Sequence, residues 1–211
     1  MDTAVAEPNR MGRKRDHSRD GDILDAALEV LAETGYDGMT IDMVASRAKA
    51  GKATLYRRWE SKAELVIDAV ACMKKTDLDV DNLPDTGTLR GDLIGMIKTL
   101  TIQEGERKLR VMSGLASLIS RSPELAETAR AAIIEPRLAL NRTLMQRAKD
   151  RGEIPADANI ELVAMIAPAM ISYRVLMLGT PSNREFMVSL IDTVILPALG
   201  IRPQPGEVSA T

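Results

Sequence analysis

Residues that carry covalent, redox or metal chemistry are scarce in this sequence. Its 211 residues include a single cysteine and a single histidine. Cys72 has no partner for an internal disulfide, and a lone thiol suits a reducing compartment. His17 stands far from Cys72 along the chain, so the usual partners in a metal centre or an activated nucleophile are missing. We therefore expect no catalytic residue, no metal and no cofactor, and we expect Cys72 to be a small core residue.

Long apolar runs and aromatic rings are also in short supply. The longest uncharged apolar stretch, residues 162–173, is shorter than the roughly 18 residues that a membrane span requires, and no hydrophobic signal peptide opens the chain. Aromatic residues make up 2% of the sequence, although its 45% hydrophobic residues suffice for a buried core. We expect a cytoplasmic protein that does not bind the membrane.

The most informative stretch is residues 41–59, IDMVASRAKAGKATLYRRW. Thr40 precedes it and is a residue type that caps helix N-termini. Apolar residues then recur at helical spacing as far as Ala48, and Leu55 and Trp59 lie one turn apart beyond Gly51. The pattern predicts two short packed helices, with Gly51 supplying the left-handed backbone of the turn between them.

Positive charge is concentrated in this region. Between residues 47 and 62, six lysines and arginines stand against one acidic residue, Glu60, which gives a local net charge of +5 in a chain whose total is -2. A local excess of this size indicates a polyanionic partner such as nucleic acid. A helical hairpin with an ordinary solvated basic face is the alternative.

Helix signals flank this stretch on both sides. A helix predicted over residues 20–34 stops at Gly35, and a capping box from Ser61 to Glu64 opens another helix. The whole segment, ILDAALEVLAETGYDGMTIDMVASRAKAGKATLYRRWESKAELVIDAV, resembles the DNA-binding domain of the tetracycline-repressor (TetR) family of bacterial transcription regulators. One departure is Gly51, which stands where this family often has Ser or Thr, so a hydroxyl contact to phosphate is missing.

The resemblance implies an all-α fold in which an N-terminal three-helix helix-turn-helix DNA-binding domain joins a C-terminal helical ligand-binding and dimerisation domain. We expect a flexible basic arm over residues 1–18, the DNA-binding domain with the start of the connecting fourth helix over 19–75, a linker over 76–87, the helical domain over 88–200 and a flexible tail over 201–211. The implied function is a ligand-responsive regulator, a repressor, that binds a palindromic operator as a homodimer and is released by a small molecule. An all-helical enzyme and a helical dimer that binds protein partners are the alternatives.

The residues expected to contact DNA come from the basic arm and the helix-turn-helix: Arg13, Lys14, Arg15, Thr40, Arg47, Lys52, Ala53, Thr54, Tyr56, Arg57 and Lys62. Lys52, Thr54 and Tyr56 are expected near base edges or adjacent phosphates, and Ala53 could touch a thymine methyl. The remaining helix-turn-helix residues are assigned chiefly to the phosphate backbone. The arm could add phosphate or minor-groove contacts, and a solvated tail that aids solubility explains it equally well.

The last two predicted helices are apolar on both faces. No charge occurs between Glu161 and Arg174, and one domain core covers only one face of a helix. The surplus surface predicts a homodimer in which these helices meet their copies in a four-helix bundle, and burial inside a larger monomer is the alternative. The residues assigned to this interface are Val163, Ala167, Ile171, Val175, Met187, Ile191 and Ile195.

Flexible methionines rather than aromatic rings supply the large side chains of the predicted C-terminal helices. Such side chains adapt to guests of different shape, so we expect a site for a small apolar or amphipathic ligand there. Ordinary core packing is the alternative. The lining assigned to this site is Met96, Leu100, Met112, Leu115, Ile119, Met145, Met165, Met170 and Tyr173.

Overall fold

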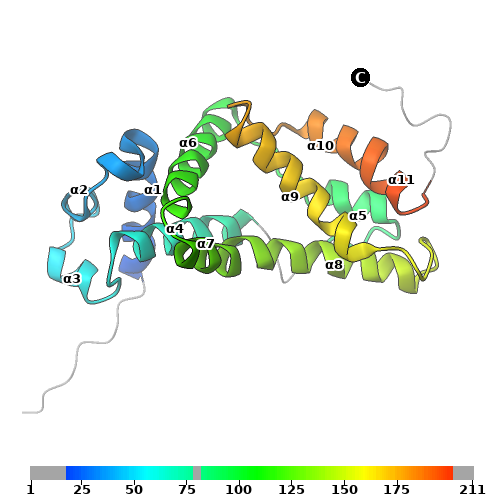
Figure 1. The fold of residues 1–211 in the computed structure, drawn as a ribbon, viewed down its shortest axis with the longest axis horizontal. Coiled ribbons are helices and arrows are strands. Elements are labelled where there is room, and N and C mark those ends of the chain that lie inside the picture. Colours follow the sequence, from blue (N-terminus) through cyan, green and yellow to red (C-terminus); the bar gives the residue numbers. More distant parts are fainter. Residues whose placement is uncertain (1–17, 78–81, 202–211) are drawn as a thin grey trace, which may run out of the picture.

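The computed structural model describes residues 18–77 and 82–201, and within these ranges every regular element is a helix (Figure 1). The all-α fold expected from the sequence is therefore confirmed. Arg13, Lys14 and Arg15 of the expected arm lie outside the described residues. So do residues 78–81 of the expected linker and all of the expected tail beyond Ile201.

The N-terminal unit consists of α1 (Ser18–Gly38), α2 (Ile41–Arg47), α3 (Lys52–Tyr56) and α4 (Lys62–Asp77). The first helix was expected to stop at Gly35. Gly35 has a φ of 67° and interrupts the helix there, although one further turn follows to Gly38. Thr40 caps α2 as expected, because its hydroxyl accepts a hydrogen bond of 3.2 Å from the amide of Met43.

The turn between α2 and α3 differs from the prediction. Gly51 has a φ of -75° and a ψ of 141°, an extended backbone that any residue can adopt. The left-handed residue is Lys49, with a φ of 49°. The amide of Lys49 donates to the carbonyl of Ser46 at 3.2 Å and the amide of Ala50 to that of Ala45 at 2.9 Å, which are the two bonds of a Schellman motif. Lysine occupies the position where glycine is the usual sequence signal, so the pattern alone pointed to the wrong residue.

The C-terminal half begins with α5 (Leu89–Gly95) and α6 (Ile102–Ile119). Apolar residues recur at helical spacing from Leu89 to Leu100, yet α5 ends at Gly95. The next segment is α7 (Pro123–Ala129), a five-residue π-helix η1 (Arg130–Ile134) and α8 (Glu135–Asp150). Pro136 lies in the first turn of α8, directly after η1. The π-helix accommodates this proline, because proline lacks an N–H and its ring crowds the carbonyl four residues earlier, inside η1.

The last elements are α9 (Ile160–Leu176), α10 (Arg184–Leu190), the π-helix η2 (Ile191–Ile195) and α11 (Leu196–Ala198). The side chain of Asn183 accepts a hydrogen bond of 2.9 Å from the amide of Phe186, so Asn183 caps the N-terminus of α10. Figure 1 shows an elongated molecule in which α2 and α3 lie at one end, α11 lies at the other, and α6 stands between the two halves.

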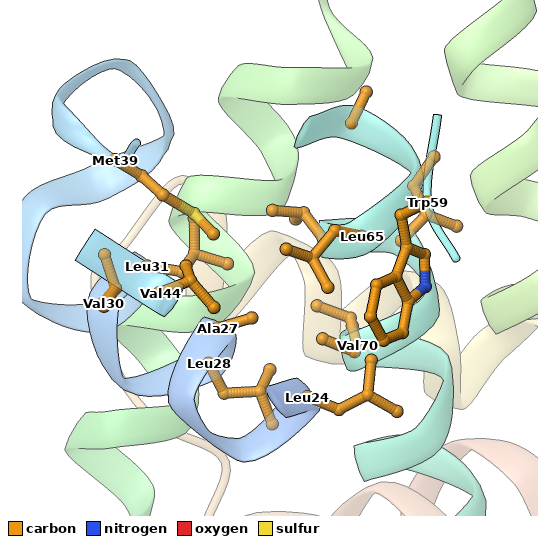
Figure 2. Close-up of a cluster of buried hydrophobic side chains, with 14 of the residues drawn as sticks. Leu24, Ala27, Leu28, Val30, Leu31, Met39, Val44, Trp59, Leu65 and Val70 are labelled. Carbon is orange, nitrogen blue, oxygen red and sulfur yellow. The ribbon is translucent and has the colours of Figure 1, made fainter. Parts of the chain in front are cut away.

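The first hydrophobic core extends beyond the N-terminal unit. Figure 2 shows Leu24 and Leu28 of α1 close to Val70 of α4, with the ring of Trp59 at one side. The same cluster contains buried residues of α6: Val111, Leu115 and Leu118. A Cβ added at Gly114 of α6 would lie 2.7 Å from Leu31 Cδ1 of α1, so only glycine allows these helices to pack so closely. Cys72 was expected to be a small core residue, but it is exposed on α4.

A second core fills the other half and is built from α5, α8, α9 and the last helices. An ionic network around Asp92 of α5 lies beside this core. The carboxylate of Asp92, which is fully buried, accepts a 2.7 Å hydrogen bond from the amide of Thr86 and pairs with Arg151 at 3.1 Å. A buried charge is tolerated when it is paired and hydrogen-bonded. This network therefore connects the segment before α5 to α5 and to the end of α8.

Candidate nucleic-acid interface

The α2–α3 pair is anchored from behind by two residues that the sequence assigned to the core. Leu55 is fully buried beneath α3, and Trp59 is buried beyond its end. The indole Nε1 of Trp59 donates a hydrogen bond of 2.9 Å to Asp68 of α4. The position of α3 is therefore fixed by α4, and the opposite side of α3 is left for a partner.

Most of the helix-turn-helix residues expected to contact DNA are exposed. We call Thr40, Lys52, Ala53, Tyr56 and Arg57 the recognition surface, since all five are exposed, while Thr54 is half-buried beside them. Lys52 Nζ lies 2.5 Å from a carboxylate oxygen of Asp42, and both side chains are more than half exposed. An exposed pair of this kind contributes little stability, so the Lys52 ammonium remains available to a phosphate or a base edge.

Arg47 points away from this surface toward α1. Its guanidinium donates hydrogen bonds of 2.9 Å and 2.6 Å to the two carboxylate oxygens of Glu33 and a third of 3.3 Å to Glu29. The hydrogen bond from Arg47 lowers the pKa of Glu33, and the same bond raises the pKa of Arg47. The sequence could not distinguish this direction from an outward one, because both acidic partners lie one helix away.

Lys62 is also turned inward. Its ammonium donates to the carbonyls of Tyr36 at 2.7 Å and Met39 at 2.9 Å, and it lies 4.3 Å from the centroid of the Tyr36 ring. Burial lowers the pKa of Lys62. The side chain therefore satisfies carbonyls at and just beyond the C-terminal end of α1.

The same corner receives a residue from the C-terminal half. Arg121, just after α6, pairs with the carboxylate of Asp37, and its guanidinium carbon lies 5.2 Å from the centroid of the Tyr36 ring. The end of α1, the start of α4 and the end of α6 therefore meet at Tyr36 and Asp37. No sequence signal identified this junction, since Arg121 lies far along the chain from Asp37.

The methionine-rich lining expected for a ligand site is not gathered around one cavity. Met112, Leu115 and Ile119 pack in or against the first core, whereas Met96 and Met145 belong to the second. The remaining residues of that set are half-buried or exposed at other places: Leu100, Met165, Met170 and Tyr173. Ordinary core packing accounts for the buried methionines.

The two faces of α9 are the reverse of the expectation. The residues assigned to the dimer interface are buried or half-buried within the protomer: Val163, Ala167, Ile171, Val175, Met187, Ile191 and Ile195. Five exposed residues instead follow one another at helical spacing in a stripe, which we call the α9 stripe: Leu162, Met165, Ala169, Tyr173 and Leu176. Apolar periodicity could not choose between the faces because both are apolar. The small buried residues Ala164 and Ala167 were the available signal, and Asn141 of α8 donates a hydrogen bond to the carbonyl of Ala164 on that face.

Two other features were sought in residues 18–77 and 82–201: a metal site and a membrane-spanning helix. No group of three histidine, cysteine, aspartate or glutamate side chains there is arranged to hold a metal ion. No helix in the same ranges combines the length and apolarity required to cross a bilayer.

Comparison with family models adds two matches. The model described as "Bacterial regulatory proteins, tetR family" matches residues 23–69, and the model described as "Tetracyclin repressor-like, C-terminal domain" matches residues 83–194. The first match covers the helix-turn-helix, and the second covers the helices from α5 to η2.

Comparison with individual proteins gives the same picture. An HTH-type transcriptional regulator of Mycobacterium tuberculosis is 35% identical over 181 residues, which cover 86% of this chain and 88% of the relative. A DNA-binding transcriptional repressor TetR of Mycobacteroides abscessus is 34% identical over 86% of this chain and 94% of its own length. Among solved structures, the transcriptional regulator FadR of Bacillus subtilis in complex with stearoyl-CoA matches with a TM-score of 0.60 at 18% identity, covering 84% of this chain and 96% of that one.

Proposed function

Since the chain belongs to the TetR family of bacterial transcriptional regulators, we propose that it is a ligand-responsive repressor that binds a palindromic operator as a homodimer. Its relatives are transcriptional regulators, and the chain is not an enzyme. A repressor among the relatives supports the direction of control. A regulator of this kind acts in the cytoplasm, where the DNA is.

The recognition surface carries the DNA-binding part of the proposal. Lys52 and Tyr56 project from a short helix that is fixed by buried residues, and half-buried Thr54 lies between them. We assign these three to base edges or adjacent phosphates, Ala53 to a thymine methyl, and Thr40 and Arg57 to the phosphate backbone. Arg13, Lys14 and Arg15 are proposed to add contacts from the arm.

The α9 stripe carries the dimer part of the proposal. Leu162 is 57% exposed, Met165 45% and Tyr173 53%, and the three lie on one side of α9. Val194 of η2 is also exposed. An exposed apolar patch of this kind marks an interaction site, and a second copy offers the matching surface in a twofold dimer. Two recognition surfaces about 34 Å apart could then enter successive major grooves of a palindrome.

A small apolar or amphipathic molecule is proposed to release the repressor from DNA. It can do so only by binding one separation of the two recognition surfaces more tightly than the other. The complex of FadR with stearoyl-CoA supports the idea that a fold of this kind accommodates an amphipathic molecule. Motion of α4 would transmit the change, because α4 holds α3 through the Trp59–Asp68 bond.

The experiment that tests the proposal is selection of duplex DNA from a random pool by the purified protein, followed by binding measurements on the enriched sequence at several salt concentrations. We expect a palindrome to be enriched, and we expect affinity for it to fall as salt rises, as it does when lysines and arginines neutralise phosphates. Random duplexes should bind far more weakly. Equal affinity for all duplexes, or none at low salt, would refute specific DNA binding.

A further inference from the structure

A groove with a volume of about 530 Å³ opens where the N-terminal unit meets the C-terminal half. Helices α1 and α6 form its sides, and the end of α9 with Gly179 contributes a third wall. Helices α1 and α6 lie side by side in Figure 1, and one end of α9 comes close to α6. The apolar part of the lining includes Leu31, Leu109 and Val175. A volume of this size is within the range of about 300–1,000 Å³ that small-molecule sites occupy.

Three glycines belong to the lining: Gly35, Gly114 and Gly179. A Cβ at Gly114 of α6 would lie 2.7 Å from Leu31 Cδ1 of α1, so these two helices approach closely at the groove. Gly35 and Gly179 have φ values of 67° and 59°, and a Cβ at either position would meet no atom within 4 Å. Both positions resist other residues because of their backbone angles.

The two charged residues of the lining, Asp37 and Arg110, differ in how closely they are paired with an opposite charge. Asp37 is already bound by Arg121. Arg110, by contrast, meets Glu106 at 3.9 Å, and both of these side chains are more than half exposed. Such a pair is weak, so most of the guanidinium donors of Arg110 remain available. An arginine with donors to spare binds a carboxylate through two parallel hydrogen bonds.

We propose that the groove binds a small amphipathic anion, with its apolar body between α1 and α6 and its carboxylate on Arg110. The site is distinct from the methionine-rich set expected from the sequence. The ligand would contact α1 on one side and α6 and α9 on the other, beside the junction at Tyr36 and Asp37. It would therefore bias the angle between the two halves of the protomer. The effect on DNA affinity rests on the proposed function, whereas binding in the groove does not.

The first test is isothermal titration of the full chain, without DNA, with 4-butylbenzoate, neutral 4-butylbenzyl alcohol and cationic 4-butylbenzylamine. We expect the anion to bind most tightly and the amine most weakly. Arg110→Gln should lower the affinity for the anion about tenfold, to the level of the alcohol, because a charge-assisted hydrogen bond is lost. Arg107→Gln is the matched control, since Arg107 is exposed on the same helix but does not line the groove, and it should change nothing.

The second test fills the groove. Ser113 lies in the lining on the exposed side of α6, so Ser113→Phe should abolish binding of the anion and the alcohol alike. Gln103→Phe adds the same ring to an exposed position of α6 outside the groove and should leave binding intact. Absence of binding to the wild-type chain, equal binding of the amine, or unchanged binding in both groove variants would overturn the site. Because no DNA is present, these outcomes do not depend on whether the chain represses.

Discussion

At the scale of single residues, the helix-turn-helix cations serve two different purposes. Lys52 and Arg57 point outward, whereas Arg47 and Lys62 are hydrogen-bonded to acceptors within the N-terminal unit. The sequence counted all of them as one basic patch. Their positions relative to α1 decide the difference, and Glu33 and the carbonyl of Tyr36 come from parts of the chain that no local pattern connects to them.

The role of Arg47 can be decided by exchanging charges. If Arg47 holds α2 against α1, Arg47→Glu should weaken DNA binding and lower the thermal unfolding midpoint. Combining it with Glu33→Arg should restore both, because the ion pair is rebuilt in reverse and Glu29 also faces the new arginine. If Arg47 contacts a phosphate, the double variant should remain defective in anisotropy measurements on the selected operator, since a carboxylate would then face the DNA.

Lys49 offers a test of stored backbone strain. A left-handed lysine costs roughly 1–2 kcal/mol, and the greater flexibility of unfolded glycine offsets part of any gain from replacing it. Lys49→Gly should therefore raise the free energy of unfolding by about 0.5–1 kcal/mol in urea denaturation. Lys49→Ala removes the same charge but keeps the strain, so it should produce no such gain. Equal stability of the two variants would show that the turn is unstrained.

At the scale of elements, α9 depends on its neighbour α8. Pro168 lies inside α9 and cannot donate the helical hydrogen bond to the carbonyl of Ala164. Asn141 of α8, which is 4% exposed, donates to that carbonyl through its side-chain nitrogen at 2.9 Å. One buried amide thus repairs the helix at the position where proline interrupts its hydrogen bonds.

A double-mutant cycle measures this repair. Asn141→Ala should cost about 1–3 kcal/mol in the wild-type chain, because it leaves a buried carbonyl without a donor. In a Pro168→Ala background the new backbone amide can reach Ala164, so the same substitution should cost less, with a coupling of about 0.5 kcal/mol or more by urea denaturation. Equal costs in the two backgrounds would mean that Asn141 acts only by filling space.

Sequence patterns predicted the helices well where local chemistry decides them. The cap at Thr40 and the inward direction of Leu55 and Trp59 both follow from neighbouring residues. Sequence patterns did not predict the features that depend on packing between helices. The faces of α9 are both apolar, so the choice between them depends on the fit of Ala164 and Ala167 against α8. The α1–α6 groove was not foreseen, because its walls are far apart along the chain.

At the scale of the whole molecule, the proposed DNA-binding and dimerisation surfaces lie on different parts of an elongated protomer. The recognition surface is on α2 and α3, the α9 stripe is on the other half, and α6 stands between them (Figure 1). The first core includes α6, so a movement in the C-terminal half reaches α1 directly as well as through α4. In a dimer joined by α9, a small rotation within each protomer would change the separation of the two recognition surfaces.

The most direct test is the mass of the protein–DNA complex in sedimentation experiments with the selected palindrome. We predict two chains on each duplex. Tyr173→Glu, in the α9 stripe, should give a monomer that no longer holds the palindrome, because a buried unpaired charge would face its copy. Ile102→Glu changes an exposed apolar residue outside the stripe and should still give two chains on each duplex. One wild-type chain on each duplex, or an intact complex with Tyr173→Glu, would contradict a dimer built on α9.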